Sequence, residues 1–150
     1  MMMKKIVFIL SIVCLFVVVT ISCKCKSKEE CANPAQTEDN SATCLDWVGT
    51  YSGLLPCADC SGIETQLSLK EDNTYQITWK YMEKNDNVYV EEGTFVWDAT
   101  GGIITLENLD VTKFPTMYKV CENSLLQLDL EGNVVTGEIA DKYILRKNQE

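Results

Sequence analysis

Residues 63–81, which read IETQLSLKEDNTYQITWKY, decide the fold of this chain. Apolar and polar side chains alternate from Ile63 to Leu69 and again from Tyr75 to Tyr81, which is the period of a strand with one buried face. The Glu-Asp-Asn sequence between the two runs is typical of a tight turn. The stretch therefore predicts two antiparallel strands joined as a hairpin.

The same pattern recurs along most of the 150 residues. Turn sequences rich in Asn, Asp and Gly separate the runs, and no convincing helix is predicted between them. Consecutive antiparallel strands in this number predict an all-β fold, a small up-and-down β-barrel, which leaves no exposed sheet edge. A two-sheet sandwich is the alternative. We expect about eight strands, at residues 47–54, 63–69, 75–81, 88–97, 103–106, 117–121, 124–130 and 143–145.

Two local features of these runs carry further expectations. Leu126, Leu128 and Leu130 alternate with polar residues in the run 124–130, so the three leucines are expected to share the buried face. Gly93 lies inside the run 88–97 and is expected to mark a β-bulge.

The first 22 residues have the layout of a secretory signal peptide. A short basic segment, Met1 to Lys5, precedes an apolar run from Ile6 to Val19 that is too short for a comfortable membrane-spanning helix. The sequence Thr20-Ile21-Ser22-Cys23 then resembles a lipobox, with Thr where Leu is usual. We therefore expect Cys23 to be lipidated, with an uncleaved N-terminal anchor helix as the alternative. Either arrangement tethers the protein to a membrane.

The residues after Cys23 predict where the anchor sits. Lys24 follows the cysteine, and by resemblance to lipoprotein sorting rules a residue other than Asp there favours the outer membrane. Residues 23–44 lack apolar periodicity and are expected to form a flexible tether with a reach of roughly 25 Å. Residues 45–147 are expected to form the barrel domain, either periplasmic or exposed at the cell surface.

The charge of the chain limits its partners. The formal net charge is −9, and removal of residues 1–22 takes away Lys4 and Lys5, which brings it to −11. An acidic chain without a basic cluster is a poor ligand for nucleic acid, because that binding depends on Lys and Arg displacing counterions. The sequence contains no His, so the commonest general base and metal ligand is missing.

One short motif carries chemistry: Leu55-Pro56-Cys57-Ala58-Asp59-Cys60-Ser61-Gly62. Thiols at this spacing close a small disulfide or converge on a soft ion such as Cu(I), and the two states can alternate. A thioredoxin-like role is disfavoured because a strand, not a helix, is expected after Gly62. A zinc site is disfavoured because only Cys44 and Cys121 are left to complete four ligands.

Other sulfur atoms have less specific roles. Besides the favoured Cys57–Cys60 bridge, Cys44–Cys121 and Cys25–Cys31 are the pairings we expect next, since the compartment outside the cytoplasm is oxidising. Met82 and Met117 are lone methionines at strand positions and are expected to pack in the core rather than bind copper.

The motif and its surroundings resemble a known family. Residues 49–65, GTYSGLLPCADCSGIET, are similar to the N-terminal domain of the NlpE family of outer-membrane lipoproteins, and Gly93-Thr94-Phe95 and residues 128–133, LDLEGN, fit the same pattern. The resemblance covers about residues 45–146. It implies a lipocalin-like barrel, a link to copper resistance, and envelope-stress signalling through a sensor kinase.

The same resemblance marks a boundary. Longer family members carry a second, oligonucleotide-binding-like domain, whereas this chain ends soon after Tyr143-Ile144-Leu145-Arg146. Functions that rest on the second domain are therefore not carried over.

Three classes of function follow from these observations. The leading one is a non-enzymatic envelope lipoprotein that senses copper or thiol redox state through Cys57 and Cys60. The alternative is a lipocalin-like carrier of a small apolar ligand. An enzyme is the least supported, because Asp59 and Glu64 are the only carboxylates near the motif and neither has a partner recognisable in the sequence.

Overall fold

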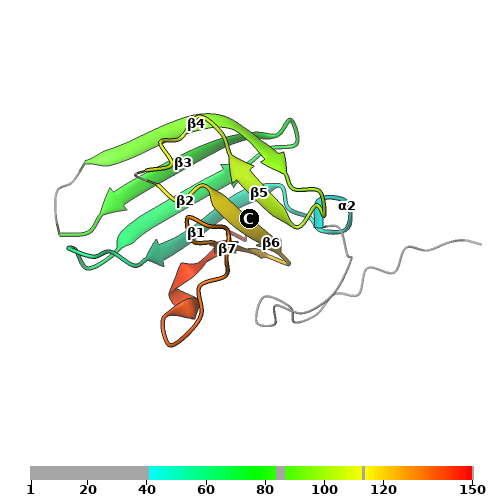
Figure 1. The fold of residues 1–150 in the computed structure, drawn as a ribbon. Coiled ribbons are helices and arrows are strands. Elements are labelled where there is room, and N and C mark those ends of the chain that lie inside the picture. The colour runs from blue at the N-terminus through cyan, green and yellow to red at the C-terminus, as the bar shows by residue number, and fades with distance from the viewer. Residues whose placement is uncertain (1–40, 84–86, 113, 150) are drawn as a thin grey trace, which may run out of the picture.

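The structure is a closed eight-stranded antiparallel β-barrel, which confirms the predicted fold class and excludes the two-sheet sandwich (Figure 1). The computed structural model describes residues 41–83, 87–112 and 114–149, so the predicted signal peptide, Cys23, Cys25 and Cys31 lie outside the described residues. Each strand pairs with the next one in sequence, and the last pairs with the first. The strands are β1 (Gly49–Leu55), β2 (Ile63–Leu69), β3 (Thr74–Tyr81), β4 (Val88–Trp97), β5 (Ile103–Leu106), β6 (Met117–Cys121), β7 (Ser124–Gln127) and β8 (Ile144–Lys147).

The strands are unequal in length, and the longest ladders lie among the first four strands. The β1–β2, β2–β3 and β3–β4 ladders each pair seven residues, whereas the later ladders pair four or fewer. In β1, β2 and β3, alternate residues point inward and most of them are buried, as the period of two predicts, whereas Phe95 is the one buried residue of β4. The core includes Tyr51, Leu67, Ile77, Ile104, Tyr118, Leu125 and Leu145.

The barrel closes through a short seam between β1 and β8. Only Tyr51 with Lys147 and Ser52 with Arg146 are in register there. Gly53 follows directly, and a Cβ atom at this position would lie 2.8 Å from the Ile144 carbonyl oxygen. A glycine is therefore needed where the last strand crosses the first.

The prediction for β7 is right only in part. The strand ends at Gln127 rather than Leu130. Leu126 and Leu128 are buried as predicted, 3% and 2% exposed, but they lie outside the core cluster, to which Leu125 belongs. Leu130 is 66% exposed. Gln127, which pairs with Tyr118 of β6, is buried on the same face of the strand as Leu125, and Leu126 is buried on the opposite face.

Gly93 does not form the predicted bulge, because the β3–β4 ladder runs through it without interruption. Its cross-strand partner is Tyr75, whose ring atoms would lie 3.0 Å from a Cβ at position 93. The Tyr75 hydroxyl donates a hydrogen bond to the Glu107 carbonyl oxygen at 2.7 Å. The glycine therefore makes room for a buried aromatic ring rather than for an extra residue.

The folded domain begins earlier than the sequence predicts. Helix α2 (Ser41–Cys44) lies within the predicted tether, yet Ser41 donates to the Val120 carbonyl oxygen at 3.1 Å and the Ala42 amide donates to Gly101 at 3.0 Å. A short 3-10 helix, η1 (Ala140–Tyr143), precedes β8. Within the described part of the chain, no helix has the length and apolar character needed to cross a membrane.

Candidate functional site

The Cys57 and Cys60 loop, residues 56–62, joins β1 to β2 at the end of the barrel opposite α2 (Figure 1). The structure joins the two cysteines in a disulfide, with their Cα atoms 5.3 Å apart. This separation is ordinary for a disulfide. Asp59 is exposed and both cysteines are half-buried, so the bridge is open to reagents from solvent.

The residues around the bridge explain the shape of the loop. Pro56 follows the last residue of β1 and has no amide hydrogen with which to extend the ladder. Gly62 precedes β2 with φ of +155°, and a Cβ there would lie 2.7 Å from the Leu54 side chain. Only glycine fits that close approach, so the loop is held tightly between two strand ends.

Both sulfur atoms lie against oxygen atoms. The Cys57 Sγ is 3.5 Å from an Asp59 carboxylate oxygen, and the Cys60 Sγ is 3.3 Å from the Gly62 carbonyl oxygen. A disulfide has no S–H to donate, so these are contacts in the oxidised form. After reduction, both thiols would find an acceptor in place.

The loop also brings together a possible ligand set. One ligand atom each from Cys57, Asp59 and Cys60 lies within 4.8 Å of the others. Two thiolates select soft ions such as Cu(I), so these residues fit a copper ion once the bridge is reduced. In the disulfide form the sulfur atoms are not thiolates, and the set does not bind a metal in that way.

Two competing interpretations of the motif lose their support. Strand β2 follows Gly62, so no helix dipole acts on either thiol as it does in a thioredoxin-like site. Cys44 and Cys121 are themselves disulfide-bonded and are therefore not free to complete a zinc site. The pairing of Cys44 with Cys121 stays a prediction.

Hydrogen bonds connect the loop to the hairpin between β3 and β4, a link that the sequence did not predict. The Met82 amide donates to the Gly62 carbonyl oxygen at 3.0 Å, and the Ser61 hydroxyl donates to the Glu83 carboxylate. Gly62 thus contacts both Cys60 and Met82. No local pattern signals this link, because it joins residues about 20 positions apart.

Met117, the other methionine considered as a copper ligand, lies in a different part of the barrel. Its sulfur lies 3.3 Å from where a Cβ of Gly132 would be, in the turn after β7. It therefore packs against a turn and is not part of the cysteine loop.

The two carboxylates near the motif lie on different elements. Glu64 lies on β2, across from Lys80 in the β2–β3 ladder and across from Leu54 in the β1–β2 ladder. Asp59 is on the exposed loop.

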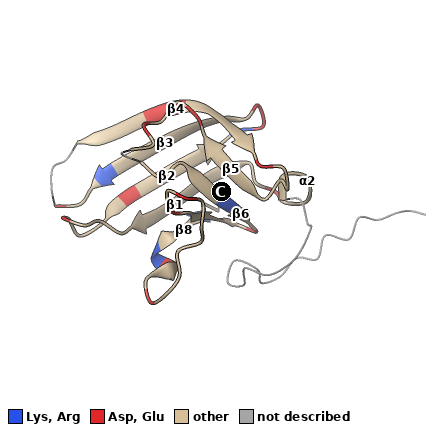
Figure 2. Ribbon diagram, in the orientation of Figure 1, with Lys and Arg blue, Asp and Glu red and all other residues tan. Residues whose placement is uncertain are grey.

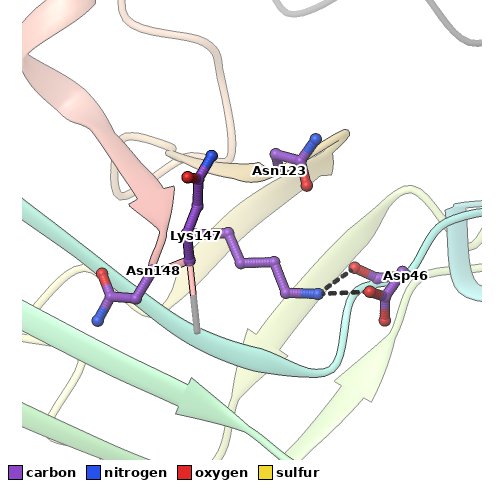
Figure 3. Close-up of a pocket in the computed structure, with 5 residues that line it drawn as sticks. Asp46, Asn123, Lys147 and Asn148 are labelled. Atoms are coloured by element: carbon purple, nitrogen blue, oxygen red, sulfur yellow. Dashed lines mark hydrogen bonds and ion pairs between the residues drawn. The ribbon is translucent and has the colours of Figure 1, made fainter.

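Two surface hollows lie among the described residues, and the side chains that line them are mostly polar or charged. One is lined by Glu64, Gln66, Thr78, Lys80 and Val88. The other lies beside α2, where the Lys147 ammonium reaches the Asp46 carbonyl oxygen at 2.7 Å and its carboxylate at 2.9 Å (Figure 3). The lysine there is already paired, and the barrel interior is filled by side chains.

Comparison with known proteins identifies relatives. The model of the NlpE N-terminal domain family matches residues 51–138. Lipoprotein NlpE of Escherichia coli strain K12 is 29% identical over 140 residues, which are 92% of this chain and 55% of that protein. The chain therefore spans about half the length of this curated relative.

Two solved structures are also similar. A candidate lipoprotein from Shewanella oneidensis is 43% identical, with a TM-score of 0.67 over 75% of this chain and 98% of that one. The Cpx pathway activator NlpE from Escherichia coli is 30% identical and has a TM-score of 0.48, over 68% of this chain and 52% of that one. The first of these supports the fold over nearly the whole length of the relative.

Proposed function

The chain belongs to the NlpE N-terminal domain family, and on this basis we propose that it is a non-enzymatic lipoprotein of the cell envelope that senses copper or thiol redox state through Cys57 and Cys60. The observation that carries the proposal is an accessible disulfide in a loop whose reduced form presents two sulfur ligands. The many buried side chains that point into the barrel favour this function over a carrier that holds a ligand inside it.

The chemistry of the switch is thiol–disulfide exchange. A dithiol reductant of the envelope would give two electrons and two protons to the Cys57–Cys60 bridge, while its own thiols close to a disulfide. Binding of Cu(I) to the resulting pair releases both thiol protons. Copper and reductant therefore act in the same direction, because both favour the open, dithiol form of the loop.

The position of the loop suits a sensor on a tether. Helix α2, where the described chain begins, lies at one end of the barrel, and the cysteine loop lies at the other (Figure 1). With lipidated Cys23 as the anchor in the outer membrane, the tether would join the barrel at the α2 end. The cysteine loop would then be free to meet copper, a reductant or a signalling partner such as an envelope-stress sensor kinase.

A copper titration tests the proposal. The full chain, purified in detergent with its anchor, is reduced and titrated with Cu(I) against a chromophoric chelator. The control is the double variant Cys57→Ser and Cys60→Ser, which keeps every other cysteine. We expect the reduced wild-type protein to bind at least one more Cu(I) equivalent tightly than the reduced variant does. Equal binding by the two proteins would remove copper from the proposal, and a free-thiol count before and after mild reduction would test the redox function separately.

A further inference from the structure

Strand β4 extends beyond its partner on one side. It spans ten residues, but β5 pairs only with Phe95, Val96 and Trp97. The preceding segment, Val88–Thr94, pairs with β3 on its other edge. Figure 1 shows β4 at the top of the barrel, with β5 beside only its C-terminal part. Half of β4 is therefore an edge strand in an otherwise closed barrel.

The hydrogen bonds at the boundary show which backbone groups face the open side. The Phe95 amide donates to Asn73, toward β3, whereas the Thr94 carbonyl oxygen accepts from the Glu107 amide on the other side at 2.8 Å. Because these directions alternate along an antiparallel strand, the amide and carbonyl groups of Val88, Val90 and Glu92 point away from β3. Within the described ranges of the chain, no strand pairs with them there.

The side chains of this segment are apolar and exposed on both faces. Val88, Tyr89 and Val90 are 55%, 45% and 51% exposed. Val88 and Val90 share the outer face, and the Tyr89 ring lies 5.9 Å from that of Tyr81. An exposed apolar edge is a template for another strand, so proteins either protect it with charge or use it for binding.

The charges of β4 indicate what kind of strand fits. Glu91 and Glu92 follow the apolar segment and point to opposite faces, and β4 contains no Lys or Arg (Figure 2). A second copy paired antiparallel about Val90 would bring the two Glu91 side chains onto the same face as diagonal neighbours, between chains of net charge −9. Like charges therefore disfavour self-pairing, and a basic strand is favoured.

We propose that the free edge of β4, Val88–Glu92, binds an extended segment of a partner protein as an added strand, with apolar side chains against Val88, Tyr89 and Val90 and Lys or Arg opposite Glu91 and Glu92. The backbone of β4 supplies the affinity, and the exposed side chains supply the selectivity, as in other cases of strand addition. This interface does not depend on copper or on the redox state of Cys57 and Cys60.

Fluorescence anisotropy of the full chain in detergent tests the interface with two labelled peptides. The basic probe is Thr-Val-Lys-Lys-Val-Thr-Val, and the acidic probe has Glu in place of both Lys. We expect the basic probe to bind about tenfold more tightly, since two favourable cross-strand charge pairs replace two unfavourable ones. The double variant Glu91→Lys and Glu92→Lys should reverse this preference.

A proline variant separates strand addition from simple charge attraction. The Val90 amide points away from β3, so Val90→Pro removes a donor to the added strand without removing one from the barrel. We expect Val90→Pro to weaken the binding of the basic probe by about tenfold. Val90→Thr, which keeps the amide and the β-branch, should bind as wild type, and so should Val96→Ala, which changes an equally exposed residue in the paired part of β4. Circular dichroism confirms that each variant is folded.

Three results would overturn the proposal. The first is no binding of the basic probe to the wild-type protein. The second is equal binding of the two probes, or a preference that Glu91→Lys with Glu92→Lys leaves unchanged. The third is a concentration-dependent dimer in sedimentation that Val90→Pro abolishes, which would assign the edge to a second copy of the chain.

Discussion

The two ends of the barrel are built differently. At the α2 end, the Trp47 ring packs edge-on against Phe95 and Trp97 with centroids 5.7 and 5.5 Å apart, and the Tyr51 hydroxyl donates to the Trp47 carbonyl oxygen at 2.7 Å. At the other end, a half-buried disulfide loop is joined to the neighbouring hairpin by a few hydrogen bonds. The α2 end is stabilised by aromatic packing, whereas the loop end holds the reactive cysteines.

This difference implies that stability and chemistry can be changed independently. Substitutions of Trp47, Phe95 or Trp97 should make the barrel easier to unfold without changing what the cysteine loop binds. Variants of the loop should remove metal binding or redox activity while the barrel remains folded. The following predictions test this separation, from the largest expected change in stability to the smallest.

Trp47→Ala should have the largest effect. The substitution removes two ring contacts and the indole hydrogen bond to the Ala42 carbonyl oxygen at 3.2 Å, so the free energy of unfolding should fall by about 3 kcal/mol. Urea unfolding followed by circular dichroism measures the change. Leu54→Ala is the matched control at the loop end, because its side chain is 56% exposed and the loss there should stay within about 0.5 kcal/mol. Equal losses in the two variants would contradict the comparison.

The double variant Cys57→Ser and Cys60→Ser should have a smaller effect. The bridge closes a loop with a sequence separation of three, and the chain-entropy estimate for so short a loop is about 2 kcal/mol. Urea unfolding under non-reducing conditions gives the value. If the loss were larger than that of Trp47→Ala, the disulfide would be a main support of the barrel and the comparison would fail.

Tyr51→Phe should have the smallest effect at neutral pH, about 1 kcal/mol, because it removes one hydrogen bond. Its effect on alkaline stability is more specific. Burial, and then the charge of Asp46, raise the pKa of Tyr51 to about 12, compared with 10.0 for an exposed tyrosine. The unfolded state therefore loses its proton first, so the stabilisation is complete below pH 10 and is lost as the pH rises toward 12.

Unfolding measured across that pH range checks the alkaline prediction. Tyr51→Phe should lose less stability between pH 10 and 12 than the wild-type protein does, although Tyr75, whose pKa burial also raises to about 12, still contributes. Asp46→Asn should lower the pKa of Tyr51 in an absorbance titration while keeping the hydroxyl. An unchanged alkaline profile in Tyr51→Phe would contradict the assignment.

The sequence predicted most of the fold because strand periodicity is a local property. Seven of the eight strands begin and end within two residues of the expected positions, and the turns at residues 71–73, 98–102 and 131–133 were recognised by their Gly, Asn or Asp. The prediction for β7 was only partly right because Leu125 and Leu126 are both buried, one on each face of the strand, so an alternation of apolar and polar residues does not tell which face meets the core cluster. The predicted bulge at Gly93 was wrong because the Tyr75 ring, which occupies the space beside the glycine, lies on another strand.

In the candidate site, too, local features could be predicted from the sequence and contacts between distant residues could not. Cys57, Asp59 and Cys60 come from one short stretch, so their proximity could be predicted from spacing alone. The links from Gly62 to Met82 and from Ser61 to Glu83 join two different turns and appear only in the folded barrel. The free edge of β4 was also unpredictable, because it depends on the lengths of two strands and on where their register begins.

The short seam between β1 and β8 has a consequence for how the protein is made. The first strand stays half-paired until the last one arrives, since Lys147 and Arg146 pair with Tyr51 and Ser52 and the Asn148 amide donates to the Thr50 carbonyl oxygen at 2.8 Å. A chain delivered N-terminus first, from a ribosome or through a translocation channel, cannot complete the barrel before these residues emerge. Contacts this distant in sequence are also slow to form. Closure of the seam therefore has to wait for residues 146–148, and the sheet stays open until they have emerged.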